Sequence, residues 1–213
     1  AQDHKRVFEG DKGKNTGGMG AYSPSRLIDD KLQKKIINKI IKPTLKGLAE
    51  LGSEYKGFLY AGLMIVNNEP YLIEYNVRMG DPECQVIMPR LKTDLVKILN
   101  KVVSNNLNKI KINWSKNKCM TVVLCSKGYP GKYKKSIDIK NLNKIKDRKN
   151  TFIFHAGTKL VQNKFISIGG RVLNITSTGK SFKNIRKNIF KTIRKINWKK
   201  GFFRKDIGWR VIS

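Results

Sequence analysis

The sequence predicts an α+β fold built from two successive parts. In the first part, residues 58–77 have the strand, turn and strand pattern of an antiparallel hairpin. Amphipathic helical patterns precede and follow this hairpin, over residues 32–41 and 93–102. The second part, over residues 118–196, contains short strands and one long amphipathic helix. These patterns indicate an antiparallel sheet with helices, followed by a small mixed α/β domain.

Composition limits the classes of protein that the chain can represent. With 213 residues, 39% of them hydrophobic, it is long enough to bury a core in one or two domains. The net charge of +30 comes from 45 Lys and Arg against 15 Asp and Glu, spread without a basic tail or block. A solvated basic surface is therefore favoured over a specific nucleic-acid site. The alternative function is a nucleic-acid-binding protein, and it predicts binding with a steep salt dependence.

The targeting and redox signals of the sequence are few. Three cysteines, Cys84, Cys119 and Cys125, form no Cys-x-x-Cys pair, and their odd number excludes a complete disulfide framework. We therefore expect a reducing cytoplasm. No apolar run approaches the roughly 18 residues of a membrane span, and no signal peptide is present, so no membrane partner is expected. The chain opens at Ala1, without methionine, inside motif-like text, which suggests a fragment.

The first 25 residues are expected to form a glycine-rich loop, with five glycines between Gly10 and Gly20. The helix over residues 32–41 follows, and Pro43 either kinks it or starts a new helix. Gly52 is the predicted stop.

The predicted hairpin consists of strands over 58–66 and 71–77 with a turn over 67–70. Thr93 is the predicted N-cap of the next helix, and a domain boundary is placed near Asn113, giving domains 1–112 and 113–213.

The second part is predicted to begin with a strand over 118–126. Further short strands are predicted over 151–155, 164–168 and 171–176. Ser181 is the predicted N-cap of the final helix. The buried stripe of this helix is expected to contain Phe182, Ile185, Ile189, Ile193 and Ile196.

Alternation along the second hairpin strand predicts a polar site. Because alternate side chains of a strand share a face, Glu74, Asn76 and Arg78 should project together. The residues expected to pack behind them are Ile73, Tyr75 and Val77. Mg²⁺ prefers oxygen ligands, which Glu74 and Asn76 supply, and a guanidinium can hold a phosphate or carboxylate. The alternative is an edge strand whose polar side chains face water.

Several long motifs of this chain resemble one enzyme family. They are "QDHKRVFEGDKGKNTGGMGAYSP", "GFLYAGLMIV", "IEYNVRMGDPECQ", "GYPG", "FHAGTKL", "GGRVLNITSTG" and "RKDIGWR". In this order they are similar to the phosphoribosylamine–glycine ligases, also called glycinamide ribonucleotide synthetases, of the ATP-grasp superfamily. The resemblance covers essentially the whole chain. It implies the C-terminal part of an ATP-grasp domain followed by the small C-terminal domain of this enzyme.

The resemblance also implies an activity and its ligands. The family joins glycine to 5-phosphoribosylamine with ATP, giving glycinamide ribonucleotide, ADP and phosphate in purine biosynthesis. Glycyl phosphate is the implied intermediate, and Mg²⁺ or Mn²⁺ the implied metal. The family's N-terminal half should precede Ala1 and is the missing partner, so the isolated fragment is expected to be inactive. Another ATP-grasp carboxylate–amine ligase is the alternative within the superfamily.

The family's site residues map onto matching positions of this sequence. Glu74 and Asn76 match the metal and nucleotide ligands, and Arg78 and Asp81 match the catalytic positions, with Asp81 expected to receive the glycine ammonium. His155 is expected to be structural, while Arg171 either helps at the active site or makes a strand entry. The implied substrate-binding residues are Asp3, His4, Lys5, Asn15, Thr16, Gly17, Gly18, Met19, Gly80, Pro82 and Glu83.

Overall fold

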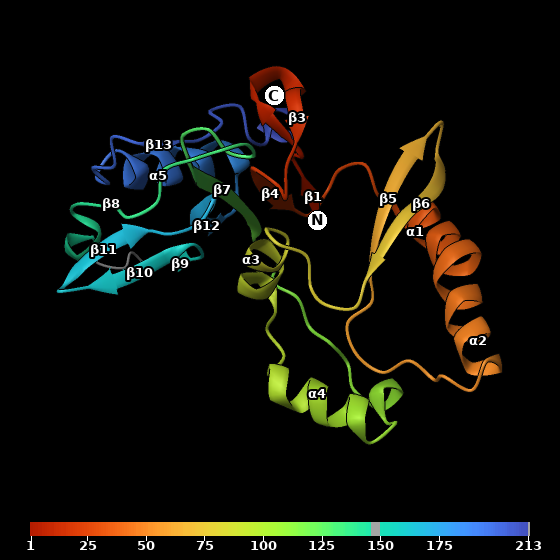
Figure 1. The fold of residues 1–213 in the computed structure, drawn as a ribbon. Helices are drawn as coiled ribbons and strands as arrows, with labels where there is room; N and C mark the ends of the chain where they lie inside the picture. The colour runs from red at the N-terminus through yellow and green to blue at the C-terminus, as the bar shows by residue number, and fades with distance from the viewer. Residues whose placement is uncertain (146–149, 213) are drawn as a thin grey trace. The chain divides into compact units, whose positions relative to one another are not determined.

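The computed structural model describes residues 1–145 and 150–212, and the chain forms two compact units (Figure 1). Both units are discontinuous along the chain. Unit 1 comprises Ala1–Pro24, Asp81–Arg90 and Ser115–Ser213, and unit 2 comprises Ser25–Gly80 and Leu91–Trp114. Unit 1 thus takes residues from both sides of Asn113, so the compact units and the two sequence domains divide the chain differently.

An antiparallel sheet of six strands forms the centre of unit 1. Its order is β1-β4-β7-β12-β9, and β13 pairs with one end of β7. The pairing of β4 with β7 joins residues 20–23 to residues 119–122, about a hundred positions away. The strands are β1 Gln2–Asp3, β4 Gly20–Ser23, β7 Lys118–Ser126, β9 Thr151–His155, β12 Arg171–Gly179 and β13 Gly201–Phe202.

Helices cover the central strand of this sheet. Helix α5, Phe182–Ile193, packs its apolar stripe on β7 and β12. Helix α3, Cys84–Ile87, contributes Val86 to a separate small cluster with Ala21 and Cys119. Strand β7 is buried from its second residue to its last. The predicted strands and final helix of this region are confirmed, except that the helix ends at Ile193, so Ile196 of the predicted stripe lies beyond it and is half-buried. Ser181 does occupy the N-cap of α5, although its side chain makes no capping hydrogen bond.

Smaller elements complete unit 1. The expectation of one long loop over the first 25 residues was wrong, because this stretch contains four short strands. They pair with one another, β1 with β4 and β2 with β3, and β4 also pairs with the distant β7. A two-stranded sheet joins β2 to β3, and a three-stranded sheet has the order β10-β11-β8. The bounds are β2 Arg6–Phe8, β3 Lys12–Asn15, β8 Ile137–Asp138, β10 Thr158–Val161, β11 Lys164–Ser167 and α6 Trp209–Ile212.

Unit 2 contains the predicted hairpin, β5 Tyr60–Val66 and β6 Glu69–Asn76. Its turn is shorter than predicted: only Asn67 and Asn68 lie between the strands, with φ values of 50° and 59°. Positive φ at both central residues is the requirement of a tight hairpin turn, and asparagine tolerates it. The helices of this unit are α1 Asp30–Ile36, α2 Lys42–Glu50 and α4 Leu95–Val103.

Two helix boundaries in unit 2 refine the sequence predictions. A π-helical turn over Ile37–Ile41 connects α1 to α2. Pro43 lies in the first turn of α2, where proline is tolerated although it has no backbone N–H. The N-cap of α4 is Asp94 rather than Thr93, because Asp94 accepts from the Lys97 amide at 3.0 Å. The Thr93 hydroxyl instead accepts from the Asn113 amide at 2.7 Å.

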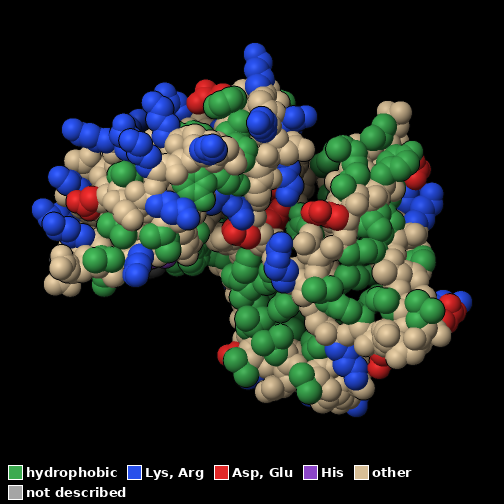
Figure 2. Space-filling view, viewed as in Figure 1, with side chains coloured by type: hydrophobic (Ala, Val, Ile, Leu, Met, Phe, Trp, Pro, Cys, Tyr) green, Lys and Arg blue, Asp and Glu red, His purple; other side chains and the backbone are tan. Residues whose placement is uncertain are grey.

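Basic side chains are numerous on the visible face of the molecule (Figure 2). Figure 2 shows Lys and Arg side chains spread over the visible face of unit 1 and at separate points of unit 2. Within residues 1–145 and 150–212, none of the helices has the length and apolar character needed to cross a membrane.

A buried arginine links the first and last segments of unit 1. Arg204 is 1% exposed and donates to Asp11 at 2.9 Å, to both Asp206 oxygens at 2.8 and 2.7 Å, and to the Arg6 carbonyl at 2.9 Å. His4 is buried beside this cluster, and its Nε2 accepts from the Gly208 amide at 3.0 Å. Because an accepting Nε2 is unprotonated, this bond requires a neutral imidazole.

We predict that this histidine makes folding pH-dependent. Burial, then the charge of Arg204, lowers the pKa of His4 to about 4, against about 6.5 in an unfolded chain. Between these values the unfolded chain binds the extra proton, so stability falls as the pH drops. The expected loss is about 3 kcal/mol by pH 4. Urea denaturation between pH 7 and 4 measures it.

The variant His4→Gln keeps an acceptor for the Gly208 amide and removes the titration, so it should flatten this part of the profile. If the free energy of unfolding falls equally with pH in wild type and in His4→Gln, the pH dependence does not come from His4.

Candidate active site

Three polar side chains lie together at the end of β6 in unit 2. The Asn76 amide Nδ2 donates to Glu74 Oε1 at 3.3 Å, and Arg78 Nη2 donates to Asn76 Oδ1 at 3.3 Å. Arg78 Nη1 also donates to the Met79 carbonyl at 2.9 Å. Glu74 and Arg78 are exposed and Asn76 is half-buried. The three groups therefore share one side, as strand alternation predicts, and solvent reaches them.

A β-bulge lies directly before this group. Glu74 pairs with Gly62, but the next pair is Leu63 with Leu72, so Ile73 is an extra residue in β6. Bulges bend a strand and re-aim its side chains, and they are frequent beside functional sites. A side chain on Gly62 would place its Cβ 3.0 Å from the Glu74 Cγ, so the absence of a side chain at Gly62 leaves room for the carboxylate.

The apolar backing of this site differs from the sequence prediction. Tyr75 does pack toward the helices, and its hydroxyl lies 2.7 Å from Thr44 Oγ1. Ile73 and Val77, expected to pack behind the site, are instead 65% and 75% exposed. Within unit 2 the helices therefore leave these two side chains of the hairpin segment uncovered.

The donor set at the end of β6 suits a hard cation. Glu74 contributes a carboxylate and Asn76 an amide oxygen, the oxygen types that Mg²⁺ accepts alongside phosphates and water. In the part of the chain that the structure describes, no three His, Cys, Asp or Glu side chains gather to form a protein-only metal site. A metal held here would take its remaining ligands from a bound nucleotide or from water.

The second group of predicted site residues lies in unit 1. The loop of Thr16 to Met19 runs beside residues 4 and 5: the Thr16 amide and hydroxyl donate to the Lys5 carbonyl at 2.8 and 2.7 Å, and the Met19 amide donates to the His4 carbonyl at 2.8 Å. The Gly18 amide donates to Thr16 Oγ1 at 3.0 Å. The structure therefore brings together the two stretches that the resemblance paired.

The turn that begins at Asp81 lies against the same loop. Gln85 Nε2 donates to Asp81 Oδ1 at 2.8 Å, and Arg171 Nη2 donates to Asp81 Oδ2 at 2.8 Å. A Cβ built on Gly18 would lie 2.4 Å from Pro82 Cδ, so the two segments are in close contact. Both carboxylate oxygens of Asp81 are oriented, yet its side chain is 45% exposed.

The remaining predicted residues differ widely in exposure. Lys5 and Asn15 are exposed, and Lys5 pairs with the half-buried Asp3 at 3.1 Å. The others are buried: His4, Met19, Gly80 and Glu83. Glu74, Asn76, Arg78 and Gly80 belong to unit 2, and the rest of the predicted set belongs to unit 1.

Two residues outside the predicted site hold the loop. For Arg171 the sequence left open either a contribution to the active site or the start of a strand, and it assigned no role to Tyr129. Both contact Gly17: Arg171 Nη1 donates to its carbonyl at 2.8 Å, and the Tyr129 hydroxyl accepts from its amide at 2.9 Å. The signal that could have found them is their place in the "GYPG" and "GGRV" motifs. His155, which was expected to be structural, has its Nδ1 2.8 Å from Thr158 Oγ1.

The cysteines do not supply a nucleophile. All three are free thiols, which agrees with the expected absence of a disulfide framework. Burial raises the pKa of Cys119 and of Cys125 to about 12, and burial together with Asp81 raises the pKa of Cys84. At neutral pH these groups stay protonated, and a protonated thiol is a poor nucleophile.

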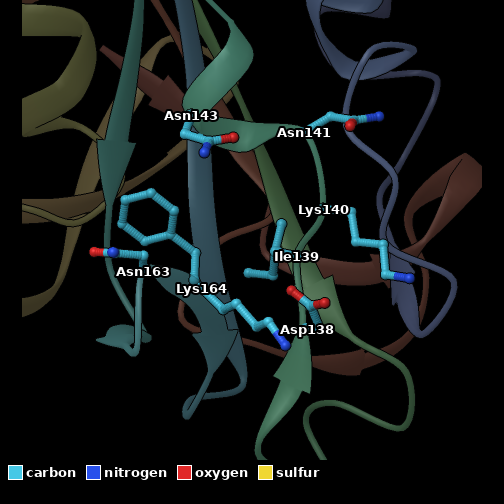
Figure 3. Close-up of a pocket in the computed structure, with 8 residues that line it drawn as sticks. Asp138, Ile139, Lys140, Asn141, Asn143, Asn163 and Lys164 are labelled. Carbon is cyan, nitrogen blue, oxygen red and sulfur yellow. The ribbon is translucent and has the colours of Figure 1, made fainter.

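A small pocket of about 170 Å³ lies elsewhere in unit 1. Figure 3 shows the lining side chains, which come from strands β8 and β11, the segment after β8 and the turn before β11. These residues are Asp138, Ile139, Lys140, Asn141, Asn143, Asn163, Lys164 and Phe165. None of them belongs to the predicted site.

The fold and the polar strand end define a protein of the ATP-grasp class. Residues 1–84 match the family model of the "Phosphoribosylglycinamide synthetase, ATP-grasp (A) domain". The fold alone is shared with the biotin carboxylase domain of a thermophilic 2-oxoglutarate carboxylase, at a TM-score of 0.60 and 12% identity, over 86% of this chain and 41% of that one.

The particular family follows from the second half of the chain. Residues 119–210 match the family model of the "Phosphoribosylglycinamide synthetase, C domain". The chain therefore belongs to the phosphoribosylglycinamide synthetase family. It is similar to the phosphoribosylamine–glycine ligase of Brucella melitensis, 43% identical over all of this chain and 50% of that protein. The Thermotoga maritima ligase structure matches at a TM-score of 0.81 and 33% identity, over 96% of this chain and 50% of that one. The chain thus spans about half the length of these relatives.

We predict that Gly18 is required for the contact between the loop and the Asp81 turn. Its φ of +117° is unfavourable for residues with a side chain, and its Cβ would overlap Pro82. Gly18→Ala should therefore destabilise the chain by about 2 to 4 kcal/mol in urea denaturation.

The matched control is Gly47→Ala in α2, where an added Cβ meets nothing within 4 Å. Alanine there should be neutral or stabilise the helix by up to about 1 kcal/mol. Equal effects of the two substitutions contradict the predicted close contact at Gly18.

Proposed function

We propose that the protein to which this chain belongs joins glycine to 5-phosphoribosylamine at the expense of ATP. The family to which the chain belongs supports this activity, and the observation that carries it is the Glu74, Asn76 and Arg78 group at the end of β6. Carboxylate, amide oxygen and guanidinium on one exposed side suit a metal-bound polyphosphate. Another ATP-grasp carboxylate–amine ligase remains the alternative, and it would share these three residues.

The proposed reaction has two displacement steps. The glycine carboxylate attacks the γ-phosphorus of ATP, and ADP leaves as glycyl phosphate forms. The amine of phosphoribosylamine then attacks the acyl carbon, and phosphate leaves as the amide forms and the amine loses a proton. Neither step needs a protein nucleophile, in agreement with the protonated thiols. Catalysis would rest on positioning and on neutralising charge.

Individual residues have separate proposed roles. Glu74 and Asn76 would hold Mg²⁺ or Mn²⁺, which when bound neutralises phosphate charge. Arg78 would hold a phosphoryl oxygen or the glycine carboxylate, and Asp81 would accept the glycine ammonium on its exposed side. The substrate-binding set of unit 1 would surround the glycine and the sugar phosphate. We also propose the domains 1–112 and 113–213, a cytoplasmic location consistent with free thiols, and no specific nucleic-acid partner.

The proposed partner of this chain is the sequence that its longer relatives carry and it does not. The hairpin of unit 2 supports this proposal, because large apolar side chains are exposed along it. They are Met64, Val66, Tyr71, Leu72, Ile73 and Val77. Large apolar side chains left exposed along one hairpin indicate an interface.

We predict that Glu74→Gln, in a version of the protein extended upstream to the length of its relatives, lowers ADP formation about a hundredfold or more. The change removes the charged ligand and keeps the side-chain size. A coupled ADP assay with glycine and phosphoribosylamine measures it. Because Glu74 is exposed, the melting temperature should stay unchanged.

Glu69→Gln is the control, since Glu69 lies in the same strand and pairs with Lys35 and Lys39 at the surface. It should keep ADP formation within about twofold, because surface pairs contribute little. Wild-type turnover by Glu74→Gln removes Glu74 from the proposed site.

A further expected outcome concerns the 213-residue chain alone. It should produce little or no ADP, because it spans only about half the length of the ligases to which it is similar. The same coupled assay on this chain and on the extended version makes the comparison. Comparable turnover by both contradicts the proposed need for upstream sequence.

A further inference from the structure

The guanidinium of Arg171 joins two segments of the proposed substrate site. It lies at the start of β12 and is 21% exposed. Nη1 donates to the Gly17 carbonyl at 2.8 Å and to the Asp81 carbonyl at 2.6 Å, and Nη2 donates to Asp81 Oδ2 at 2.8 Å. One side chain therefore contacts the glycine-rich loop and the turn after β6 at the same time.

Tyr129 holds the same loop residue from its other end. Its hydroxyl accepts from the Gly17 amide at 2.9 Å, so both backbone polar groups of Gly17 are bonded to side chains of the C-terminal domain. The Tyr129 ring in turn packs on Gly170, where an added Cβ would lie 2.3 Å from its Cδ2. Residues 129, 170 and 171 thus form one packed group around the Gly17 peptide.

The close approach explains why position 17 has no side chain. A Cβ on Gly17 would lie 2.8 Å from the Arg171 Cζ and 2.9 Å from its Nη2. Even an alanine would push the guanidinium away from its acceptors. A lysine at position 171 could not replace the arginine fully, because one ammonium cannot reproduce the planar fork that reaches two carbonyls and a carboxylate.

We propose that Arg171 and Tyr129 are positioning residues that fix the Gly17 peptide and the Asp81 carboxylate for glycine binding. The inference rests on the proposed function for its effect on catalysis, but its geometric part is independent of any activity. Arg171 orients one oxygen of Asp81 and Gln85 orients the other. The exposed side of the carboxylate is then presented in one orientation, which lowers the entropic cost of binding an ammonium.

Amide hydrogen exchange on the 213-residue chain tests the geometry without any assay of activity. Tyr129→Phe removes the acceptor of the Gly17 amide, and Arg171→Ala removes the bonds to Gly17 and Asp81. Each should speed exchange of the Gly17 and Gly18 amides about tenfold or more. Lys187→Ala, an exposed charge on α5, should leave these amides unchanged. Unchanged exchange in both Tyr129→Phe and Arg171→Ala overturns the proposal.

Steady-state kinetics on the upstream-extended enzyme test the consequence. Arg171→Ala should raise the KM for glycine about tenfold or more, corresponding to one charged hydrogen bond, while the KM for ATP stays within about twofold. Arg171→Lys should lie between Arg171→Ala and wild type. A general loss of structure would instead change both KM values or lower the melting temperature, and an equal rise in both KM values overturns the proposal.

The two experiments separate this inference from the proposed function. If the wild-type extended enzyme forms no ADP with glycine and phosphoribosylamine, the proposed function fails. Faster exchange of the Gly17 amide in the variants would in that case still support the positioning of Gly17 by Arg171 and Tyr129. If the enzyme is active but Arg171→Ala changes neither the amide exchange of Gly17 nor the KM for glycine, only the positioning role of Arg171 is refuted.

Discussion

The pairing of β4 with β7 is the constraint on which unit 1 depends. Backbone hydrogen bonds hold residues 20–23 against residues 119–122, in the middle of the six-stranded sheet. The glycine-rich loop ends directly before β4, so this pairing fixes where the loop leaves the sheet. Contacts from β12 and from Tyr129 can reach Gly17 only because that end is fixed. The proposed substrate loop is therefore built on the C-terminal sheet, although it belongs to the N-terminal sequence.

Buried charge reinforces this arrangement. A guanidinium with 1% exposure is costly unless charged and polar partners surround it, and Arg204 has two carboxylates and a carbonyl. The bonds from Arg204 to Arg6 and to Asp11 link sequence positions nearly two hundred residues apart. His4 stays neutral beside them, since its ring nitrogen already accepts a backbone amide. Its substrate-binding role, implied by the resemblance, would have to act through the loop that its carbonyl holds.

The two groups of site residues follow different physical logic. At the end of β6, three side chains of one short segment interact with one another and face solvent, so their grouping needs no distant partner. Around Gly17 and Asp81, the grouping exists only through side chains that come from other elements. The first group offers ligands for a metal and a phosphate. The second offers a carboxylate whose orientation is set from two directions.

The sequence by itself determined the features that depend on neighbouring residues. Strand alternation placed Glu74, Asn76 and Arg78 on one side, and helical periodicity identified the stripe of α5, because both follow from local backbone geometry. The sequence motifs identified the family. Tertiary structure alone decided which distant segments pair, as in β4 with β7 and in the contacts of Arg171. It also decided that Ile73 and Val77 stay exposed, since burial depends on what covers a face and alternation reports only which residues share it.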